Sequence, residues 1–207
     1  IVSGSYSEWK VTIMELGICM RDLPVEQVVR LGEFAQDHGY SSIYLPETGN
    51  RTPEGGLAGR SPWISLAAMF AATKTVHGAV GVAAAPFRSL PHLALYAATL
   101  NEQSNSRFSL GIGVSHREAA TRLGVPFPTS PLRWMEVACD ELMGQARFGV
   151  TFGQGFPVLV GALGPKMVEM GAARSDGLVL NWLTPQHAQE TVALAHEIGR
   201  ANGRTPY

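Results

Sequence analysis

Apolar runs of strand length alternate with amphipathic stretches of helix length along the whole chain. The run 76–85 is nearly free of polar residues, as expected of a strand that is buried on both faces. Prolines open several of the amphipathic stretches, and proline suits the first turn of a helix. Six strands are expected, at 12–19, 42–45, 76–85, 107–114, the run that starts at Val158, and 177–183. This alternation is typical of βα units around a parallel sheet.

The number of units restricts the architecture further. A closed barrel of eight βα units usually takes about 250 residues, whereas this chain has six units in 207 residues. An open sheet of six parallel strands would leave backbone edges and apolar faces exposed. We therefore expect a TIM (β/α)8 barrel whose last βα units are missing from this sequence. No linker divides the chain, so residues 1–207 are expected to form one domain.

Composition excludes several classes of partner. The formal net charge is -1, so there is no broad basic field for a nucleic acid. No run reaches the roughly 18 apolar residues that a membrane span needs. Cys19 and Cys139 lack metal-ligand spacing, and the six histidines form no cluster with carboxylates, so no metal is expected. These features predict a cytoplasmic protein with reduced thiols that acts on a small molecule.

The segment 157–181 carries the clearest sign of a ligand site. An apolar strand runs into Gly164-Pro165-Lys166, which opens a short helix. The N–H groups at a helix start favour anions, and a lysine in the first turn opposes the helix dipole unless something negative lies beside it. The pattern indicates a phosphate site. An ordinary strand-to-helix turn with a solvated lysine remains the alternative.

Two other segments are rich in glycine. In 107–114, RFSLGIGV, two glycines are expected to bring the backbone close to a ligand or to a neighbouring strand. The loop 48–60 lacks the ending of a Walker phosphate loop and is interpreted as a mobile lid. Its Arg51 and Arg60 are either contacts for an acidic ligand or solvated side chains.

Several pieces of the chain resemble one protein family. They are GYSSIYLPE at 39–47, the long stretch 63–116 that ends in SLGIGVSH, the residues Pro131, Arg133 and Glu136, and PVLVGALGPKM with SDGLVLN. Their order and spacing resemble the luciferase-like monooxygenase family, bacterial oxidoreductases that use a flavin or coenzyme F420 and are built on a (β/α)8 barrel.

The resemblance implies where a cofactor binds. The phosphate would lie at Ala162, Leu163, Gly164, Pro165 and Lys166. The ring would lie against Gly81, Val82 and Ala83, with a cis peptide expected between Gly81 and Val82. Val114, Ser115 and His116, at the end of the fourth strand, would lie beside the ring.

The resemblance also implies candidates for the chemistry. His116 is a candidate proton donor or acceptor, since histidine titrates near neutral pH, and a histidine with no role is the alternative. Glu47 matches an acidic residue of the family, and a structural ion pair with an arginine is its alternative. Thr48 stands where many relatives have a histidine, and with Trp182 it is assigned to the substrate pocket.

Together these observations predict an oxidoreductase that transfers a hydride between coenzyme F420 and a small organic substrate. FMN is the alternative cofactor, which would make the chain a luciferase-like monooxygenase. A second alternative is a flavin-binding barrel protein without turnover. By its likeness to the family the chain is expected to be a homodimer, with the apolar face at 63–70 as a contributor.

Overall fold

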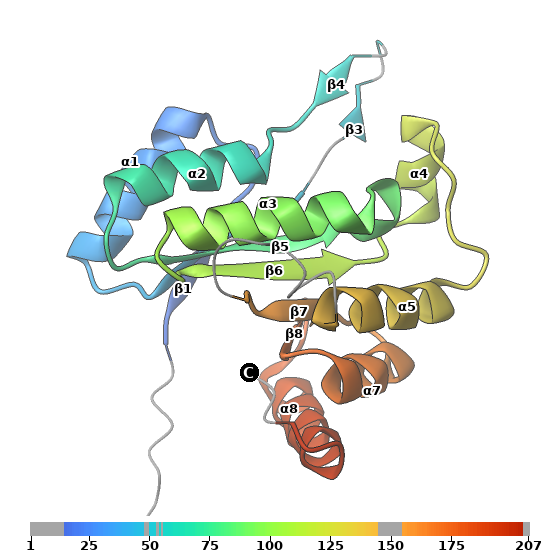
Figure 1. The fold of residues 1–207 in the computed structure, drawn as a ribbon. Coiled ribbons are helices and arrows are strands. Elements are labelled where there is room, and N and C mark those ends of the chain that lie inside the picture. The colour runs from blue at the N-terminus through green and yellow to red at the C-terminus, as the bar shows by residue number, and fades with distance from the viewer. Residues whose placement is uncertain (1–14, 48–49, 53, 55, 145–154, 205–207) are drawn as a thin grey trace, which may run out of the picture.

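Six parallel strands form one curled sheet, in the order β1-β2-β5-β6-β7-β8 (Figure 1). The computed structural model describes residues 15–47, 50–52, 54, 56–144 and 155–204. The strands are β1 (Gly17–Cys19), β2 (Ser42–Leu45), β5 (His77–Ala84), β6 (Phe108–Gly113), β7 (Val158–Gly161) and β8 (Gly177–Val179). All their pairings are parallel, as the alternation of strands and helices predicts.

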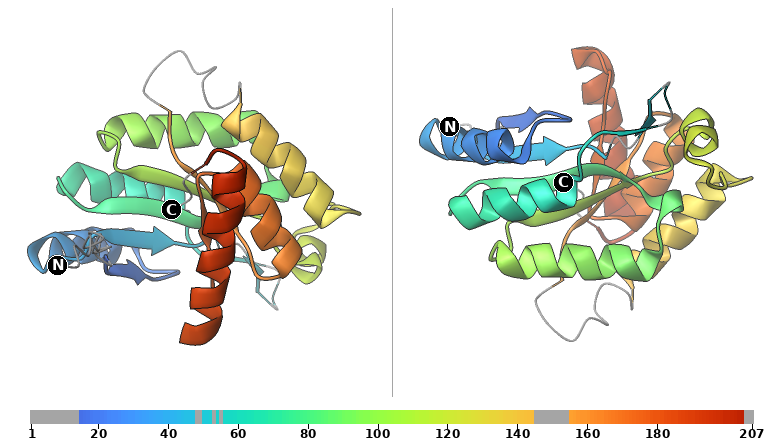
Figure 2. Two further views of the ribbon diagram at one scale, coloured as in Figure 1. Left: turned by 90° about the horizontal axis from the view of Figure 1, so that it is seen from below. Right: turned by 90° about the horizontal axis from the view of Figure 1, so that it is seen from above.

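Helices cover the outer face of the curl, and consecutive ones pack side by side (Figure 2). They are α1 (Val25–Asp37), α2 (Pro62–Ala72), α3 (Leu90–Gln103), α5 (Pro131–Met143), α7 (Pro165–Arg174) and α8 (Pro185–Ala201). The sheet is not closed within the described residues, because β1 and β8 form its two edges. The fold is therefore part of a (β/α)8 barrel, as expected.

The helix starts follow from local sequence. In α2, α3, α5, α7 and α8 a proline occupies one of the first two positions, where its missing N–H costs no intrahelical bond. The residue before α8 is Thr184, whose hydroxyl accepts a hydrogen bond from the N–H of His187. The helices α3, α7 and α8 begin soon after β5, β7 and β8, whereas longer connections lead to α2 and α5.

The main core lies between the sheet and these helices. Ile43, Val80, Phe108, Leu110 and Val158 are completely or almost completely buried. Burial of such side chains contributes about 1.5–3 kcal/mol each. Gly78 lets a helix approach this face, because an added Cβ would lie 2.5 Å from the ring of Phe70. The core fixes the strand register, and with it the positions of the strand ends.

The ladder between β5 and β6 is irregular near the end of β5. Val80 pairs with Leu110 and Ala83 with Ile112, so Gly81 and Val82 stand opposite one residue, Gly111. We call residues 81–83 the β5 bulge. The peptide bond between Gly81 and Val82 is cis, which confirms the expectation drawn from the family resemblance.

Four features differ from the sequence-based interpretation. The segment after β2 contains a short antiparallel hairpin, β3 (Asn50–Arg51) and β4 (Leu57–Ala58), where a lid loop was expected. A helix, α4 (Arg117–Leu123), occupies part of the connection between β6 and α5, and a 3₁₀ turn, η1 (Ala85–Phe87), follows β5. The sixth strand ends at Val179, four residues earlier than predicted.

The described residues contain neither a candidate membrane span nor a candidate metal cluster. No helix in the described part of the chain has both the length and the apolar character that a bilayer crossing requires. Among the same residues, no three His, Cys, Asp or Glu side chains are grouped so that they could hold a metal ion.

Candidate functional site

The carboxyl ends of the parallel strands bring the candidate residues to one edge of the sheet. The β5 bulge, residues 114–116 after β6, residues 162–166 after β7 and Trp182 beyond β8 all lie at this edge. Neighbouring strands are about 4.8 Å apart, so the ends of β5 and β7 are separated by roughly 10 Å. One small molecule can therefore contact several of these segments.

Val82 connects the β5 bulge with the ends of β6 and β7. A Cβ added to Gly113 would lie 2.7 Å from one methyl carbon of Val82, and a Cβ added to Gly161 would lie 3.3 Å from both methyl carbons. At Gly111 an added Cβ would lie 2.4 Å from the carbonyl oxygen of Val80. The glycines of 107–114 therefore allow the neighbouring strand β5 to come close, which is one of the two roles expected for them.

Tyr44 lies against the other side of the bulge. Its ring is so close to Gly81 that an added Cβ would lie 2.6 Å from Cδ1. Burial raises the pKa of the Tyr44 phenol above its usual value, and the charge of Glu15 adds to this shift. The phenol is therefore neutral over the physiological pH range. Gly81 of the bulge thus contacts the ring of Tyr44 on β2, while the Val82 side chain contacts β6 and β7.

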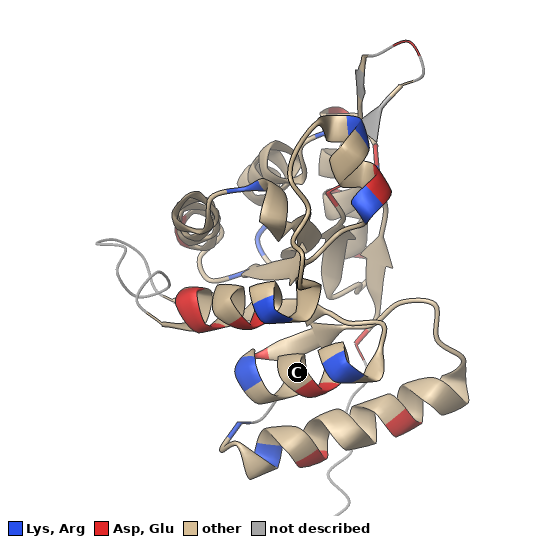
Figure 3. Cartoon of the chain, turned by 90° about the vertical axis from the view of Figure 1, so that its right-hand side faces the viewer, with Lys and Arg blue, Asp and Glu red and all other residues tan. Residues whose placement is uncertain are grey.

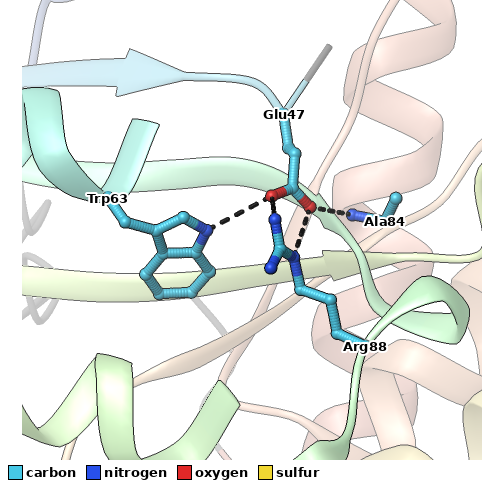
Figure 4. Close-up of polar contacts among 4 residues, drawn as sticks. All are labelled: Glu47, Trp63, Ala84 and Arg88. Carbon is cyan, nitrogen blue, oxygen red and sulfur yellow. Dashed lines mark hydrogen bonds and ion pairs between the residues drawn. The ribbon is translucent and has the colours of Figure 1, made fainter. Parts of the chain in front are cut away.

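Glu47 lies at the centre of a hydrogen-bond network beside the β5 bulge (Figure 4). Its Oε2 accepts hydrogen bonds from the Ala84 backbone N–H and from Nε of Arg88, each at 3.1 Å. Its Oε1 accepts from Nη2 of Arg88 and, at 3.3 Å, from Nε1 of Trp63. Only 11% of the Glu47 side chain is exposed. Both carboxylate oxygens are thus engaged by protein donors.

These contacts describe Glu47 as a structural group. The hydrogen bond with Glu47 raises the pKa of Arg88 above its usual value, as expected of a guanidinium paired with a carboxylate. The ion pair with an arginine, which was the alternative interpretation of Glu47, is therefore present. Its role as a catalytic group stays a prediction. Sequence analysis did not find Trp63 and Arg88 as its partners, since they lie 16 and 41 residues away.

The turn after β6 presents Ser115 and His116. Ser115 has a φ of 63°, in the left-handed region that non-glycine residues seldom adopt. This turn ends the strand and makes His116 the N-cap of α4, where its carbonyl accepts from the N–H groups of Ala119 and Ala120. The His116 side chain is exposed and makes no capping hydrogen bond. Its role as a proton donor or acceptor stays a prediction.

The 162–166 turn has the expected form of an open helix start. Gly164 is the N-cap of α7, Pro165 is the first helical residue, and no side chain caps the helix. An added Cβ at Gly164 would meet nothing within 4 Å, so the space beside it is open. Ala162 is buried, whereas Leu163 is 64% exposed, and Lys166 is exposed in the first turn. The described geometry fits an anionic group next to Gly164.

A pocket of about 290 Å³ borders this turn. It lies between the 162–166 turn, the residues after β8 and the first turns of α8. Its walls are mostly apolar, and they are formed by Ala162, Leu163, Pro165, Val168, Leu180, Leu183, His187, Glu190, Thr191 and Leu194. None of these residues belongs to the β5 bulge, so a molecule that reaches the bulge must extend beyond this pocket.

The two residues assigned to the substrate pocket differ in what the structure shows. Trp182 is 94% exposed and has a φ of 57°. It follows β8 and Asn181 on the side of the strand ends, where a substrate would enter. Thr48 lies outside the described residues. The Trp182 side chain has almost no packing partner within the described residues. It is therefore available for contact with a ligand at the strand ends.

Charged side chains around the site have specific partners. Nη1 of Arg60 donates to the carbonyl oxygen of Asp22 at 3.0 Å, so Arg60 joins the segment before α2 to the turn before α1.

Acidic and basic residues are interspersed along α5, α7 and α8 (Figure 3). Lys166 therefore belongs to a part of the chain that carries both acidic and basic side chains.

The expectation for the dimer face needs a correction. Trp63, Leu66 and Phe70 are 8% exposed or less because they pack into the core between α2, α3 and the sheet. They are thus unavailable to a second copy. Ile64 on α2 and Leu95 and Tyr96 on α3 are the large apolar side chains exposed on these helices. The homodimer itself stays a prediction.

Comparisons with known proteins agree with this geometry. Residues 14–207 match the family model described as luciferase-like monooxygenase. A 5,10-methylenetetrahydromethanopterin reductase of Archaeoglobus fulgidus is 26% identical over 185 residues, which are 81% of this chain and 52% of that protein. The chain spans about half the length of the curated relatives that it matches.

Two solved structures show the same fold. The coenzyme F420 dependent tetrahydromethanopterin reductase of Methanopyrus kandleri has a TM-score of 0.71 at 20% identity, over 92% of this chain and 62% of that chain. The oxygenating constituent of 3,6-diketocamphane monooxygenase of Pseudomonas putida, solved with FMN, has a TM-score of 0.70 at 17% identity, over 94% and 64%. The order of βα units, the β5 bulge and the family match agree, and the chain belongs to the luciferase-like monooxygenase family.

Proposed function

We propose that this chain is an oxidoreductase that binds coenzyme F420 and transfers a hydride between the cofactor ring and a small organic substrate. The observation that carries the proposal is the contact of Val82 with Gly161. It brings the β5 bulge next to the turn that opens α7, so that a ring and its phosphate tail fit the same strand edge.

The 162–166 turn supports the phosphate end of this proposal. An uncapped helix start offers backbone N–H groups and a favourable dipole to an anion. The open space at Gly164 admits the group, and the Lys166 ammonium lies in the first turn of the same helix. Hydrogen bonds to a charged group contribute about 1.5–3 kcal/mol each. This turn would therefore supply much of the affinity for the tail.

The β5 bulge supports the ring end. Gly81 and Val82 are half-buried and present a small, apolar surface, Ala83 is buried beside them, and Val114 and Ser115 follow the adjacent strand β6. A flat aromatic ring loses little water there and gains dispersion contacts. The bound cofactor would supply the hydride donor or acceptor. The protein would bind it, orient one face towards the substrate and exclude water from that face.

His116 is the group that we propose for the accompanying proton. Hydride transfer to a carbonyl-type substrate needs one proton, and the reverse reaction releases one. An imidazole can do both near neutral pH. Trp182 and Thr48 would contact the substrate. For Trp182, its exposed position after the end of β8 supports this assignment.

The choice of F420 over FMN rests on likeness. The curated relative from Archaeoglobus fulgidus is named for the reduction of a pterin derivative, and the solved reductase is called F420 dependent. The Pseudomonas putida structure contains FMN, so FMN is the second candidate. With FMN, the reaction would be a luciferase-like monooxygenation. Binding without turnover would favour the third alternative, a flavin-binding barrel protein.

Titration of the purified protein with each cofactor tests the proposal. We expect saturable binding of F420, followed by the absorbance of its ring, and weaker binding of FMN. Loss of the ring absorbance of oxidised F420 with secondary alcohols, or its return when reduced F420 is mixed with carbonyl compounds, would demonstrate hydride transfer. Tight FMN binding with no F420 binding would overturn the choice of cofactor.

A pair of lysine variants tests the phosphate end. Lys166→Ala should weaken binding of either cofactor about tenfold, the loss expected for one charged contact of about 1.4 kcal/mol. Lys74→Ala is the matched control, since Lys74 is exposed just beyond the carboxyl end of α2, away from the strand ends. Equal affinities in both variants would contradict the proposed position of the tail.

A further inference from the structure

We infer that Glu47 is a positioning residue that holds the β5 bulge in place from the end of β2. The inference rests on the proposed function in one respect, namely that the bulge supports the cofactor ring. It differs from the catalytic role expected from sequence, because Glu47 would act through the backbone of 82–84 and not on the substrate.

Regular strand pairing is lost at the β5 bulge. β2 pairs with β5 up to Leu45 and Val80, and β5 pairs with β6 up to Val80 before the register shifts. Beyond this point Pro46 has no N–H to donate. The backbone polar groups of residues 82–84 on the β2 side therefore need partners outside the regular ladder.

Glu47 supplies two such partners. Its backbone N–H donates to the carbonyl oxygen of Val82 at 3.2 Å. Its carboxylate Oε2 accepts from the N–H of Ala84 at 3.1 Å. One residue thus binds the segment on both sides of Ala83, once through its backbone and once through its side chain. The Glu47 side chain thus provides an acceptor for the Ala84 N–H beyond the last β2–β5 pair, Leu45 with Val80.

The carboxylate is itself held in one orientation. Arg88 donates to both oxygens from the residue just after η1, and Trp63 donates to Oε1 from the first turn of α2. The network therefore joins β2, α2 and the segment after β5 (Figure 4). A charged acceptor of fixed orientation holds the Ala84 N–H more tightly than a neutral or mobile one.

The consequence concerns the ring and not the phosphate. The 162–166 turn follows β7, which is two strands away from β5. Its donors to phosphate would be the backbone N–H groups of the turn itself. Loss of the Glu47 side chain should free the segment 82–84 and weaken ring binding, while the turn keeps its affinity for phosphate. A general loss of structure would weaken both ring binding and phosphate binding.

Hydrogen exchange in the ligand-free protein is the first arm of the test. In Glu47→Ala, exchange of the Ala84 amide should accelerate about tenfold or more, while the Leu110 amide, bonded to Pro157 within the sheet, keeps its rate. Glu47→Gln retains an acceptor oxygen, so it should restore part of the protection. If Glu47→Ala does not fold, Glu47→Gln provides the test in its place. Glu136→Ala is the matched control, since Glu136 pairs with Arg133 on α5.

Binding is the second arm. For Glu47→Ala, the dissociation constants of F420 and FMN should rise about tenfold, whereas that of inorganic phosphate should change less than about twofold. Unchanged Ala84 exchange, or a parallel fall in ring and phosphate affinity, would overturn the inference. If the wild-type protein binds neither cofactor, the proposed function fails, and the exchange rates alone then decide whether Glu47 holds the segment.

Discussion

Val82 lies against Gly161: a Cβ at position 161 would be 3.3 Å from both methyl carbons of the valine. Val82 belongs to the β5 bulge and Gly161 is the last residue of β7, directly before the 162–166 turn. The two parts of the proposed cofactor site are therefore in direct contact through one side chain.

The glycines along this contact should differ sharply in their tolerance of a methyl group. We expect Gly111→Ala to lower the free energy of unfolding by about 2–3 kcal/mol, because the new Cβ would overlap the Val80 carbonyl oxygen at 2.4 Å. Gly164→Ala should change it by less than about 0.5 kcal/mol, since the space there is open. Urea unfolding followed by circular dichroism measures both. A tolerated Gly111→Ala would contradict the described strand packing.

Arg107 should be one of the most important charged residues for stability. Its guanidinium donates to the carbonyl oxygens of Phe70, Thr73 and Val76, and so caps the end of α2 while it joins that helix to β6. Arg107→Met should lower the free energy of unfolding by about 2–4 kcal/mol, since it leaves several of these acceptors unpaired.

Arg174→Met is the control for Arg107. Arg174 forms an ion pair with Asp140 in which both side chains are more than 40% exposed. Exposed pairs contribute little, so this variant should lose less than about 1 kcal/mol. Similar losses for the two variants, measured by the same urea unfolding, would show that the contacts of Arg107 are not the cause.

His77 should make the fold less stable in mild acid. Burial lowers the pKa of His77, the charge of Arg107 lowers it further, and Glu15 partly opposes the shift. As the pH falls through about 6.5, the unfolded chain binds a proton that the folded chain still resists, so the free energy of unfolding decreases. The decrease stops below the pKa of the folded state.

Substitution of His77 tests this pH dependence. The ring Nε2 lies 2.9 Å from the Ser109 hydroxyl, and glutamine can keep a hydrogen bond there without a titrating group. The free energy of unfolding, measured with urea at pH 7.5 and at pH 5.5, should differ less between the two pH values for His77→Gln than for the wild type. Equal differences would mean that other groups cause the acid sensitivity.

The two cysteines should react at very different rates. Cys139 is fully buried, and burial, with the charge of Asp140, raises its pKa to about 12, so only about one thiol in ten thousand is ionised at pH 8. Cys19 is exposed, although partial burial also raises its pKa. Labelling with a thiol reagent should modify Cys19 first and Cys139 only on unfolding. Cys19→Ser should abolish the early phase, and two early phases in the wild type would contradict the burial of Cys139.

Local sequence was sufficient to predict most helices and strands. The starts of α2, α5, α7 and α8 follow from the proline in their first turn, which is visible in the sequence alone. α4 was missed because Arg117–Leu123 is short and has few apolar residues, although Gly124, with a φ of 70°, is a typical helix end. The β3–β4 hairpin was missed because its strands have only two residues each.

The candidate site was less predictable, for a physical reason. The position of the β5 bulge came from the family resemblance, since no local preference of Gly81 or Val82 requires a bulge there. The partners of Glu47 depend on how α2 packs on the sheet, which spacing along the chain does not reveal. Contacts of this kind are set by the tertiary fold, and so the ion pair of Glu47 could be offered only as an alternative.

A crystal structure of the protein with coenzyme F420 bound tests the central claim most directly. The account predicts that the phosphate of the cofactor accepts hydrogen bonds from backbone N–H groups at the start of α7, near Gly164 and Lys166. It also predicts that the ring lies against Gly81, Val82 and Ala83. A ring bound elsewhere, or a phosphate that leaves the 162–166 turn empty, would contradict it.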